Sequence, residues 1–225
     1  TCVELSCNGA TDLVGGSATV QPMKDANGRV VMVGAEAKPV GSSKDAKQLY
    51  QELQSQRTKA RSHIVFALNV HTKHKIHNSC RSGQIRIIDI AGQGALGEQA
   101  DVESAKFANQ SNVALGRVVD ALASGSDAVP YRDDLLTQTL SDTLGGNAIT
   151  QILVSLGVTK DAGSEGIHDS LNVVGLALKA QKIKNGPLMQ AHESRELIRL
   201  RQLVASHGGD EEAAPKYTEI SSLRN

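Results

Sequence analysis

The chain has 225 residues and a mass of 23.7 kDa, which suits one domain, or one domain with a short appendage. Its 24 basic residues balance its 24 acidic residues, so no net charge draws the surface as a whole to nucleic acid or to an anionic membrane. With three Tyr, two Phe and no Trp, the core must be aliphatic. This composition also argues against a protein that stacks single-stranded bases on exposed rings.

Cysteine usage and hydropathy indicate which cellular compartment the chain suits and whether it could span a membrane. The three cysteines, Cys2, Cys7 and Cys80, are an odd number, which favours a reducing compartment over a secreted disulfide scaffold. No apolar run approaches the roughly 20 residues that span a bilayer. The first residues, from Thr1, are strand-like and carry neither an initiator Met nor a leader. We therefore expect the chain to begin partway through a larger polypeptide.

The first ninety residues predict short strands around one helix. Apolar runs predict strands at five ranges: 2–6, 18–21, 29–33, 63–70 and 85–90. The turn 24–28 contains an Asn-Gly pair, which is a strong signal for a hairpin between the second and third strands. Ser42 offers an N-cap for a helix over about 44–58. The last strand, 85–90, is mostly apolar, so we expect it at the centre of a sheet.

The remaining residues predict longer helices and one more strand. Apolar residues at helical spacing predict helices over 102–123, 133–144 and 168–182. The apolar run Ile149–Leu156 predicts a strand. Strands that alternate with helices imply an α/β fold with a sheet covered on both faces. The segment Glu193–Ser206 differs, because its leucines and valine have coiled-coil-like spacing and an acidic tail follows it.

Four potential metal ligands recur at every third residue of one hydrophilic segment. They are His71, His74, His77 and Cys80. On a strand or hairpin this spacing alternates between faces instead of converging, and it matches none of the usual paired-ligand spacings. We interpret the segment as a polar hairpin tip and expect no metal site. A phosphate-binding G-x-x-x-x-G-K-[ST] loop and a G-x-S-x-G nucleophile elbow are also missing from these residues.

Two features could bind an anion or a nucleotide. Residues 57–88 hold seven Lys or Arg and no acidic residue, which indicates either a solvated basic face or a local anion-binding patch. Asp89 ends an apolar strand and Gly92 follows it. Nucleotide-binding α/β proteins hold magnesium and sense the γ-phosphate with a carboxylate at such a position. The pattern D-x-x-G also marks ordinary turns after strands, so it is weak when taken alone.

Several segments together resemble the motifs of kinesin motor domains, in collinear order, over about residues 1–187. Arg61-Ser62-His63 is similar to the end of the switch I motif N-x-x-S-S-R-S-H. Asp89-Ile90-Ala91-Gly92 is similar to the start of the switch II motif D-L-A-G-S-E. Residues 109–116 resemble the helix N-K-S-L-x-x-L-G, and residues 129–147 resemble V-P-Y-R-D-S-K-L-T-x-x-L-x-D-S-L-G-G-N. The last match is long, ungapped and specific.

The resemblance implies a fold, an activity and a division of the chain. It implies a kinesin-like α/β scaffold with a central mixed sheet flanked by helices on both faces. The scaffold would be incomplete on its N-terminal side, because the P-loop of the family lies before this region. Residues 1–187 would form the C-terminal two-thirds of a motor domain. Residues 188–225 would form a neck-linker-like segment, a short amphipathic helix and an acidic tail. The family activity is microtubule-stimulated hydrolysis of ATP with magnesium.

The switch I segment departs from the family pattern. Serines of this motif contact the γ-phosphate and magnesium in the family, whereas Lys59 and Ala60 occupy those places here. Gln56 stands where the motif has Asn, and the segment before the motif is shortened. Hydrolysis depends on groups that position water and stabilise charge, so losing several of them together removes most of the catalytic effect.

The switch II segment departs as well. Gln93 and Gly94 replace the Ser and Glu of the motif, so Arg61 keeps its charge without the Glu that it pairs with in the family. We therefore expect no functional catalytic residue and no cofactor. The remnants of the nucleotide site are Arg61, Ser62, His63, Asp89 and Gly92.

Binding to tubulin is a separate question, because the family meets an acidic surface with basic loops. The resemblance assigns four residues to the microtubule-facing side: Lys24, Arg29, Tyr131 and Arg132. Against strong binding, Leu135 replaces the Lys of the V-P-Y-R-D-S-K segment, and residues 95–102 contain no Lys or Arg. We expect weak direct binding, and attachment through another protein is an equal alternative.

Our interpretation is a kinesin-like pseudo-motor in the cytoplasm and cytoskeleton. It would be a structural or docking module in a microtubule-based assembly, such as the axoneme of a cilium, without ATP hydrolysis. We expect no nucleic-acid or membrane partner, and Glu193–Ser206 could pair with a coiled-coil partner. Two alternatives stay open. One is an active ATP-driven motor whose P-loop precedes residue 1, and the other is a switch that binds nucleotide through Asp89 and Gly92 without turnover.

Overall fold

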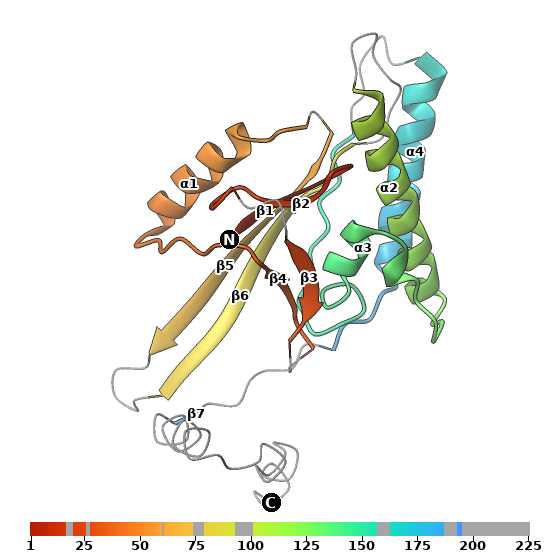
Figure 1. The fold of residues 1–225 in the computed structure, drawn as a ribbon. Coiled ribbons are helices and arrows are strands. Elements are labelled where there is room, and N and C mark those ends of the chain that lie inside the picture. The colour runs from red at the N-terminus through yellow and green to blue at the C-terminus, as the bar shows by residue number, and fades with distance from the viewer. Residues whose placement is uncertain are drawn as a thin grey trace, which may run out of the picture. The chain divides into compact units, whose positions relative to one another are not determined.

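The computed structural model describes residues 1–16, 20–25, 28–59, 61–73, 79–92, 101–156, 163–186 and 193–194 (Figure 1). The chain forms two compact units. One consists of Thr1–Leu68 with Ile85–Leu188, and the other of Asn69–Gln84 with Met189–Asn225. The residues that resemble the kinesin motifs all lie in the first unit, and this unit carries the candidate site.

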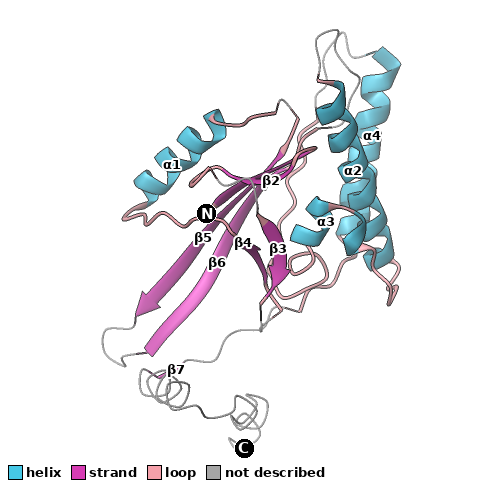
Figure 2. Ribbon diagram, viewed as in Figure 1, coloured by secondary structure: helices cyan, strands magenta, loops and turns pink. Residues whose placement is uncertain are grey.

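Figure 2 shows the strands and helices of the described residues. The strands are β1 (Cys2–Ser6), β2 (Gly9–Asp12), β3 (Gln21–Lys24), β4 (Val30–Val33), β5 (His63–Lys73), β6 (Ser79–Asp89) and β7 (Glu193–Ser194). The helices are α1 (Ser43–Ser55), α2 (Val102–Ala123), α3 (Leu135–Thr139) and α4 (Gly163–Ala180), with a 3-10 turn at Tyr131–Asp133. None of the helices in the described ranges is long and apolar enough to cross a membrane.

The strands form two sheets. The larger has the order β2-β1-β5-β6-β7, and the smaller is the hairpin β3-β4. Strand β1 runs antiparallel to both of its neighbours, so that Val3 faces Asp12 on β2 and Val65 on β5. Every pairing whose register the structure gives is antiparallel. The described strands with helices around them are consistent with the kinesin-like α/β scaffold that the resemblance implied.

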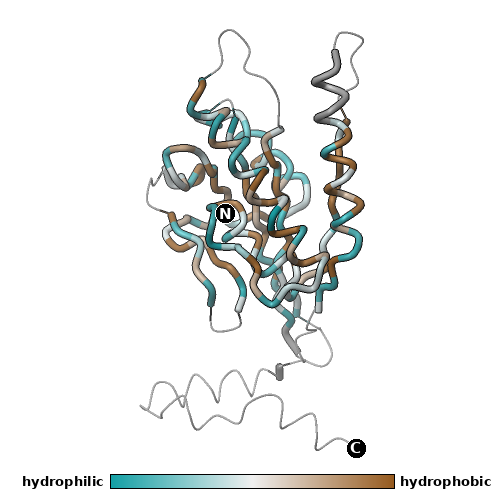
Figure 3. The backbone as a smooth tube through the Cα atoms, turned by 90° about the vertical axis from the view of Figure 1, so that its right-hand side faces the viewer, coloured by the Kyte–Doolittle hydropathy of each residue, from teal (hydrophilic) through white to brown (hydrophobic). Residues whose placement is uncertain are grey.

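Helices cover both faces of the central strands, as predicted. Alternate residues of a strand point to opposite faces. Val3 and Val65 pack in one cluster with α2 and α3, whereas Cys2 and Ile64 pack in a second cluster with α1. Figure 3 shows hydrophobic and hydrophilic residues interspersed along the backbone. The aliphatic composition therefore yields two cores, one on each side of β1 and β5.

A buried ion pair fixes β6 to the hairpin and to the turn after α3. Arg86 donates to both oxygens of Asp142 at 2.7 Å each, and it also donates to the Val30 carbonyl at 2.7 Å. The Val30 N–H donates to Asp142 at 2.7 Å. The side chains of Arg86 and Asp142 are only 10% and 5% exposed. Removing either partner would leave an unpaired charge in the core. The pair therefore holds β6, the hairpin and the turn after α3 together.

A second anchor holds the turn that follows. The Asn185 amide donates to the carbonyls of Thr143 at 2.6 Å and of Ala148 at 2.9 Å, and its oxygen accepts the Gly145 N–H at 2.8 Å. Gly145 has φ = +75°, and a Cβ there would contact the end of the Leu122 side chain. The left-handed backbone of the turn therefore favours glycine at this position.

Several predicted elements are confirmed, and one is displaced. The strand 2–6 and the helix 102–123 have the predicted bounds. Helix α1 has Ser42 as its N-cap, whose hydroxyl accepts the Asp45 N–H. The second strand lies at Gln21–Lys24 instead of 18–21, of which 18–19 lie outside the described residues. The reason is the turn, in which the Asp25 N–H donates to the Arg29 carbonyl and extends the ladder to Lys24.

Two predictions from apolar periodicity are wrong. The helix predicted over 133–144 is confined to Leu135–Thr139, because Asp134 caps its start and the chain turns from Leu140 onward. The predicted strand Ile149–Leu156 has no regular structure. A strand needs a neighbour for its backbone hydrogen bonds, and no described strand pairs with this segment.

The predicted coiled-coil helix is also corrected where the structure describes it. Glu193–Ser194 form the two-residue strand β7, which pairs with Ser79 and Cys80 of β6. Residues 195–206 lie outside the described residues. So do His74, His77 and the side chain of Cys80 from the hydrophilic segment, while His71 lies on β5.

Candidate functional site

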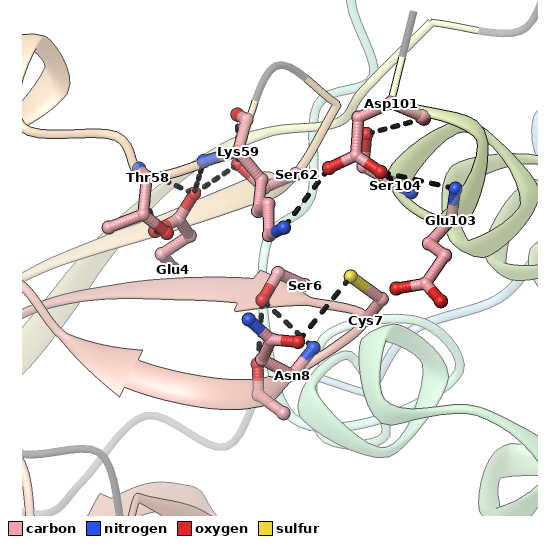
Figure 4. A network of polar contacts seen from close by, with 11 residues as sticks. Glu4, Ser6, Cys7, Asn8, Thr58, Lys59, Ser62, Asp101, Glu103 and Ser104 are labelled. Atoms are coloured by element: carbon pink, nitrogen blue, oxygen red, sulfur yellow. Dashed lines mark hydrogen bonds and ion pairs between the residues drawn. The ribbon is translucent and has the colours of Figure 1, made fainter.

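The buried carboxylate of Glu4 binds the switch I-like segment to the sheet (Figure 4). Glu4 of β1 is fully buried, and it accepts hydrogen bonds from the Thr58 hydroxyl at 2.7 Å and the Ser62 hydroxyl at 2.6 Å. The backbone N–H groups of Thr58 and Lys59 donate to it at 3.1 Å. Burial by itself raises the pKa of Glu4, but these hydrogen bonds outweigh burial and hold the pKa below its usual value. The carboxylate therefore stays ionised and holds Thr58, Lys59 and Ser62 in place.

His63 joins this segment to the end of β6. Its side chain is fully buried at the start of β5, with the ring centroid 5.4 Å from that of Phe107. Nδ1 accepts the backbone N–H of Ala91 at 3.0 Å, while Nε2 is buried without a hydrogen-bond partner. Burial lowers the pKa of His63 to about 4. The ring is therefore neutral near pH 7, with its proton on Nε2 because Nδ1 is an acceptor.

Two ion pairs connect the two switch-like segments to their surroundings. Arg57, just beyond α1, contacts the Asp89 carboxylate at 2.8 Å. Lys59 contacts the Asp101 carboxylate at 3.0 Å, and Asp101 also caps α2 by accepting the N–H groups of its first turn. The Asp89 side chain is 40% exposed, so the pair that it forms lies at the surface. Each of these charged groups is thus paired within the chain.

Both polar groups of the Ala91 backbone, its N–H and its carbonyl, form hydrogen bonds. Its N–H donates to His63, and its carbonyl accepts the Asn112 amide of α2 at 2.9 Å. Asn112 also donates to the Ala108 carbonyl at 2.8 Å. Gly92, the next residue, is exposed. The switch II-like segment is therefore tied to β5 on one side and to α2 on the other.

The structure brings together some of the predicted site residues. His63 meets the switch II-like segment at the Ala91 backbone, whereas Ser62 bonds Glu4 and Arg61 lies partly buried just before β5. Gln93 and Gly94, the replaced positions of switch II, lie outside the described residues, as do 95–100 of the following loop. Sequence reasoning assigned no site role to Arg57 or Asn112, which bind Asp89 and Ala91. The position of Glu4 could have been recognised from the sequence. An acidic residue inside an apolar strand is rarely buried without partners, so this position indicates polar contacts.

Comparison with known proteins decides the family. A family model of the kinesin motor domain matches residues 1–183. The chain belongs to the kinesin motor-domain family. It is 32% identical over 181 residues to kinesin-like protein KIN-5B of Arabidopsis thaliana. This alignment covers 73% of this chain and 17% of that protein. It is 33% identical over 171 residues to the kinesin heavy chain of Neurospora crassa, covering 74% of this chain and 17% of that protein.

A third relative has a similar identity and coverage. Kinesin-like protein Klp68D of Drosophila pseudoobscura pseudoobscura is 31% identical over 158 residues, covering 65% of this chain and 19% of that protein. The chain thus spans less than a fifth of the length of the relatives named here. Within the kinesin motif N-K-S-L, Asn112 stands at the Leu position, so the hydrogen bond to Ala91 comes from a departure from the family pattern.

The described residues do not fit the magnesium–nucleotide site that the kinesin family implies. Asp89, the carboxylate retained from switch II, binds Arg57. The Ser62 hydroxyl donates to Glu4, and Lys59 has replaced a serine hydroxyl with an ammonium that binds Asp101. Magnesium prefers carboxylate, hydroxyl and water oxygens, and a cation beside the carboxylate opposes its binding. We therefore derive no chemical step through this cofactor.

The residues that the resemblance assigns to the microtubule-facing side differ in accessibility. Lys24 is exposed at the end of β3, and Arg132 is exposed in the 3-10 turn before α3. Arg29 is partly buried and forms an ion pair with Asp25 at 3.5 Å. Tyr131 is partly buried, and its hydroxyl donates to the Leu144 carbonyl. Strand β3 contacts α3, so the hairpin and the turn lie on neighbouring elements. Lys24 and Arg132 thus offer the accessible charge.

Proposed function

We propose that this chain is a kinesin-family pseudo-motor, a structural or docking module of a microtubule-based assembly that does not hydrolyse ATP. The observation that carries the proposal is the ion pair between Arg57 and Asp89 at 2.8 Å. The carboxylate that would act near magnesium in an active motor is satisfied by a cation from the same chain. A nucleotide would have to displace this cation before it could use Asp89.

The other switch contacts support the same proposal. The Ser62 hydroxyl is directed to Glu4, and the Lys59 ammonium to Asp101. Hydrolysis requires donors aimed at the charge that develops in the transition state, and each of these groups is aimed elsewhere. A folded interaction surface does not need such donors, because fold and chemistry separate readily in evolution.

Tubulin is the partner that this proposal favours, directly or through other axonemal or cytoskeletal proteins. Lys24 and Arg132 are exposed cations that suit an acidic lattice, whereas the pairing of Arg29 with Asp25 reduces its attraction to a partner. The setting would be a stable cytoskeletal array in the cytoplasm, such as an axoneme. Residues 1–187 would supply the motor-like module, and residues 188–225 a neck-linker-like extension.

The test is microtubule co-pelleting of the full-length polypeptide without nucleotide, with ADP and with a non-hydrolysable ATP analogue. Phosphate release is measured in parallel with and without microtubules. We expect the same pelleted fraction in all three states and no microtubule-stimulated phosphate release. Nucleotide-dependent pelleting or stimulated turnover would contradict the pseudo-motor. No pelleting in any state would contradict direct binding to the lattice and leave attachment through another protein.

A further inference from the structure

The switch II-like segment meets β5 through the side chain of His63. Strand β6 ends at Asp89, so Ala91 and Gly92 lie beyond the strand and have no regular structure of their own. The Ala91 N–H donates to His63 Nδ1 at 3.0 Å. Ala91 is partly exposed and Gly92 is exposed, whereas the His63 side chain is fully buried. The bond therefore holds a short surface stretch of backbone against a buried ring.

The two nitrogens of this ring have different surroundings. Nδ1 accepts the Ala91 N–H, so the neutral ring carries its proton on Nε2. Nε2 is buried and has no hydrogen-bond partner among the described residues. Because Nε2 already carries a proton, a second proton must bind at Nδ1. The atom that the proton needs is thus the atom that holds Ala91.

Protonation changes what Nδ1 can do. A proton taken from solvent converts this nitrogen from an acceptor into a donor, while Nε2 keeps its own proton and the ring gains one positive charge. Two N–H donors repel each other at the 3.0 Å that now separates Ala91 N from His63 Nδ1. The Ala91 N–H must then leave the ring, and water can accept it because Ala91 lies near the surface.

The charged groups that face the ring come from three places in the fold. Asp134, at the start of α3, and Asp89, at the end of β6, favour the charged ring, whereas Arg57, just beyond α1, opposes it. The other neighbours are uncharged. Helix α2 places the Phe107 ring 5.4 Å away between centroids, and β1 places Leu5 opposite. Burial outweighs these charges and lowers the pKa of the imidazole from 6.5 to about 4, so the bonded arrangement selects the neutral ring.

We propose that His63 is a proton-operated latch, in which a proton on Nδ1 expels the Ala91 N–H and releases Ala91–Gly92 from β5 while the core around β5 stays folded. In the open latch the ring meets solvent and its pKa returns toward 6.5. Lowering the pH from 7 to 4 should therefore reduce the ratio of closed to open latch by on the order of a hundredfold. The latch involves neither nucleotide nor tubulin, so its failure and the failure of the proposed function are separate results.

The test is NMR spectroscopy of the isotopically labelled full-length polypeptide between pH 7 and pH 4. A scalar coupling across the hydrogen bond should join the Ala91 amide nitrogen to His63 Nδ1 at pH 7 and vanish as the pH falls. The hydrogen-exchange protection of the Ala91 amide is followed over the same range. It is divided by the protection of Ala67, whose N–H donates to the Thr1 carbonyl at 3.0 Å and which lies on the same strand as His63. This ratio separates local release from unfolding of the core.

Two variants distinguish the latch from a general loosening of the segment. His63→Asn keeps an acceptor near the Nδ1 position but cannot be protonated, so the ratio of protections should not depend on pH. Asn112→Leu is the matched control, because it removes the hydrogen bond to the other polar group of Ala91, the carbonyl, and leaves His63 intact. This variant should lower the protection of Ala91 at every pH and keep the pH dependence of the parent.

We expect the ratio of protections in the parent to fall by on the order of a hundredfold between pH 7 and pH 4. A constant ratio overturns the proposal. Loss of protection at Ala67 and Ala91 at the same pH overturns it as well, because acid would then unfold the core itself. A coupling that is missing at pH 7 overturns the assigned hydrogen bond. If His63→Asn misfolds, the coupling and the exchange in the parent decide by themselves.

Discussion

Two regions of the first unit have diverged to different degrees from the kinesin pattern. The turn region, residues 129–147, keeps a long ungapped match to the family, and its Asp142 is buried and bonded to Arg86 and to the Val30 N–H. The switch-like region, residues 57–63 with 89–92, keeps only parts of its motifs. Its ion pairs lie nearer the surface, as Arg57 and Asp89 show. The residues that match the family over a long run therefore include a buried polar contact of the scaffold, whereas the residues with partial matches form ion pairs that lie closer to solvent.

The largest effect should come from the turn region. Asp142→Asn leaves the buried Arg86 without its counter-charge, which should lower the free energy of unfolding by about 3–5 kcal/mol. Urea denaturation measures the loss. The control is Asp133→Asn, which breaks an exposed pair with Arg117 at 4.0 Å and should cost less than about 1 kcal/mol. Equal losses in the two variants would contradict the contrast between a buried anchor and surface pairs.

The second effect tests His63 at the junction of the two switch-like segments. Because its pKa falls from 6.5 in the unfolded chain to about 4 in the fold, the unfolded state binds the extra proton between these values. Stability from this group is complete above pH 6.5 and is lost as the pH falls toward 4, a change on the order of 3 kcal/mol. Denaturant midpoints across this range measure the slope. His63→Asn, which keeps an acceptor near the Nδ1 position, should remove that part of the slope, and an unchanged slope would contradict the assignment.

A smaller effect is expected at Glu4, the carboxylate that binds Thr58, Lys59 and Ser62. Glu4→Gln removes the charge that accepts the Thr58, Lys59 and Ser62 hydrogen bonds, and it should cost about 1–3 kcal/mol. Hydrogen exchange should also be faster at the Thr58 and Lys59 amides. Glu52→Gln, on the exposed face of α1, is the matched control and should change neither quantity. Unaltered exchange in Glu4→Gln would mean that the segment is ordered by other contacts.

The smallest change in stability is expected at the ion pair that carries the proposed function. Arg57→Ala and Asp89→Ala should each cost no more than about 1 kcal/mol, because the pair is partly exposed and solvent screens it. Titration with a fluorescent ATP analogue and magnesium should detect no binding to the parent or to either variant. Binding by the parent that Asp89→Ala abolishes would favour the nucleotide-binding switch. Binding gained in Arg57→Ala would mean that the cation alone closes the site.

Sequence reasoning predicted the elements whose local signals agree with their packing. The strand Cys2–Ser6, the helix Val102–Ala123 and the Ser42 cap were all found from periodicity and capping chemistry. It failed where the outcome depends on a neighbour. Ile149–Leu156 has the apolar pattern of a strand, but a pattern cannot report whether another strand is there to pair with it.

The candidate site shows the same limit. The motifs identified His63 and Asp89, because the resemblance fixes their positions in the chain. The partners Arg57 and Asn112 occupy positions that the family motifs leave open or fill with another residue type, so only the three-dimensional contacts reveal them. Their effect is to convert groups that look available in the sequence into groups that are already bonded.

The hydrogen bond from Asn112 to Ala91 has a mechanical consequence. It links the side of α2 to the end of β6 through a side-chain amide, while His63 holds the same peptide unit from β5. Any sliding of α2 along its axis must stretch this linkage or break it, because the Ala91 backbone cannot follow without losing its bond to His63. The position of α2 along its axis is therefore coupled to the end of β6 and, through His63, to β5.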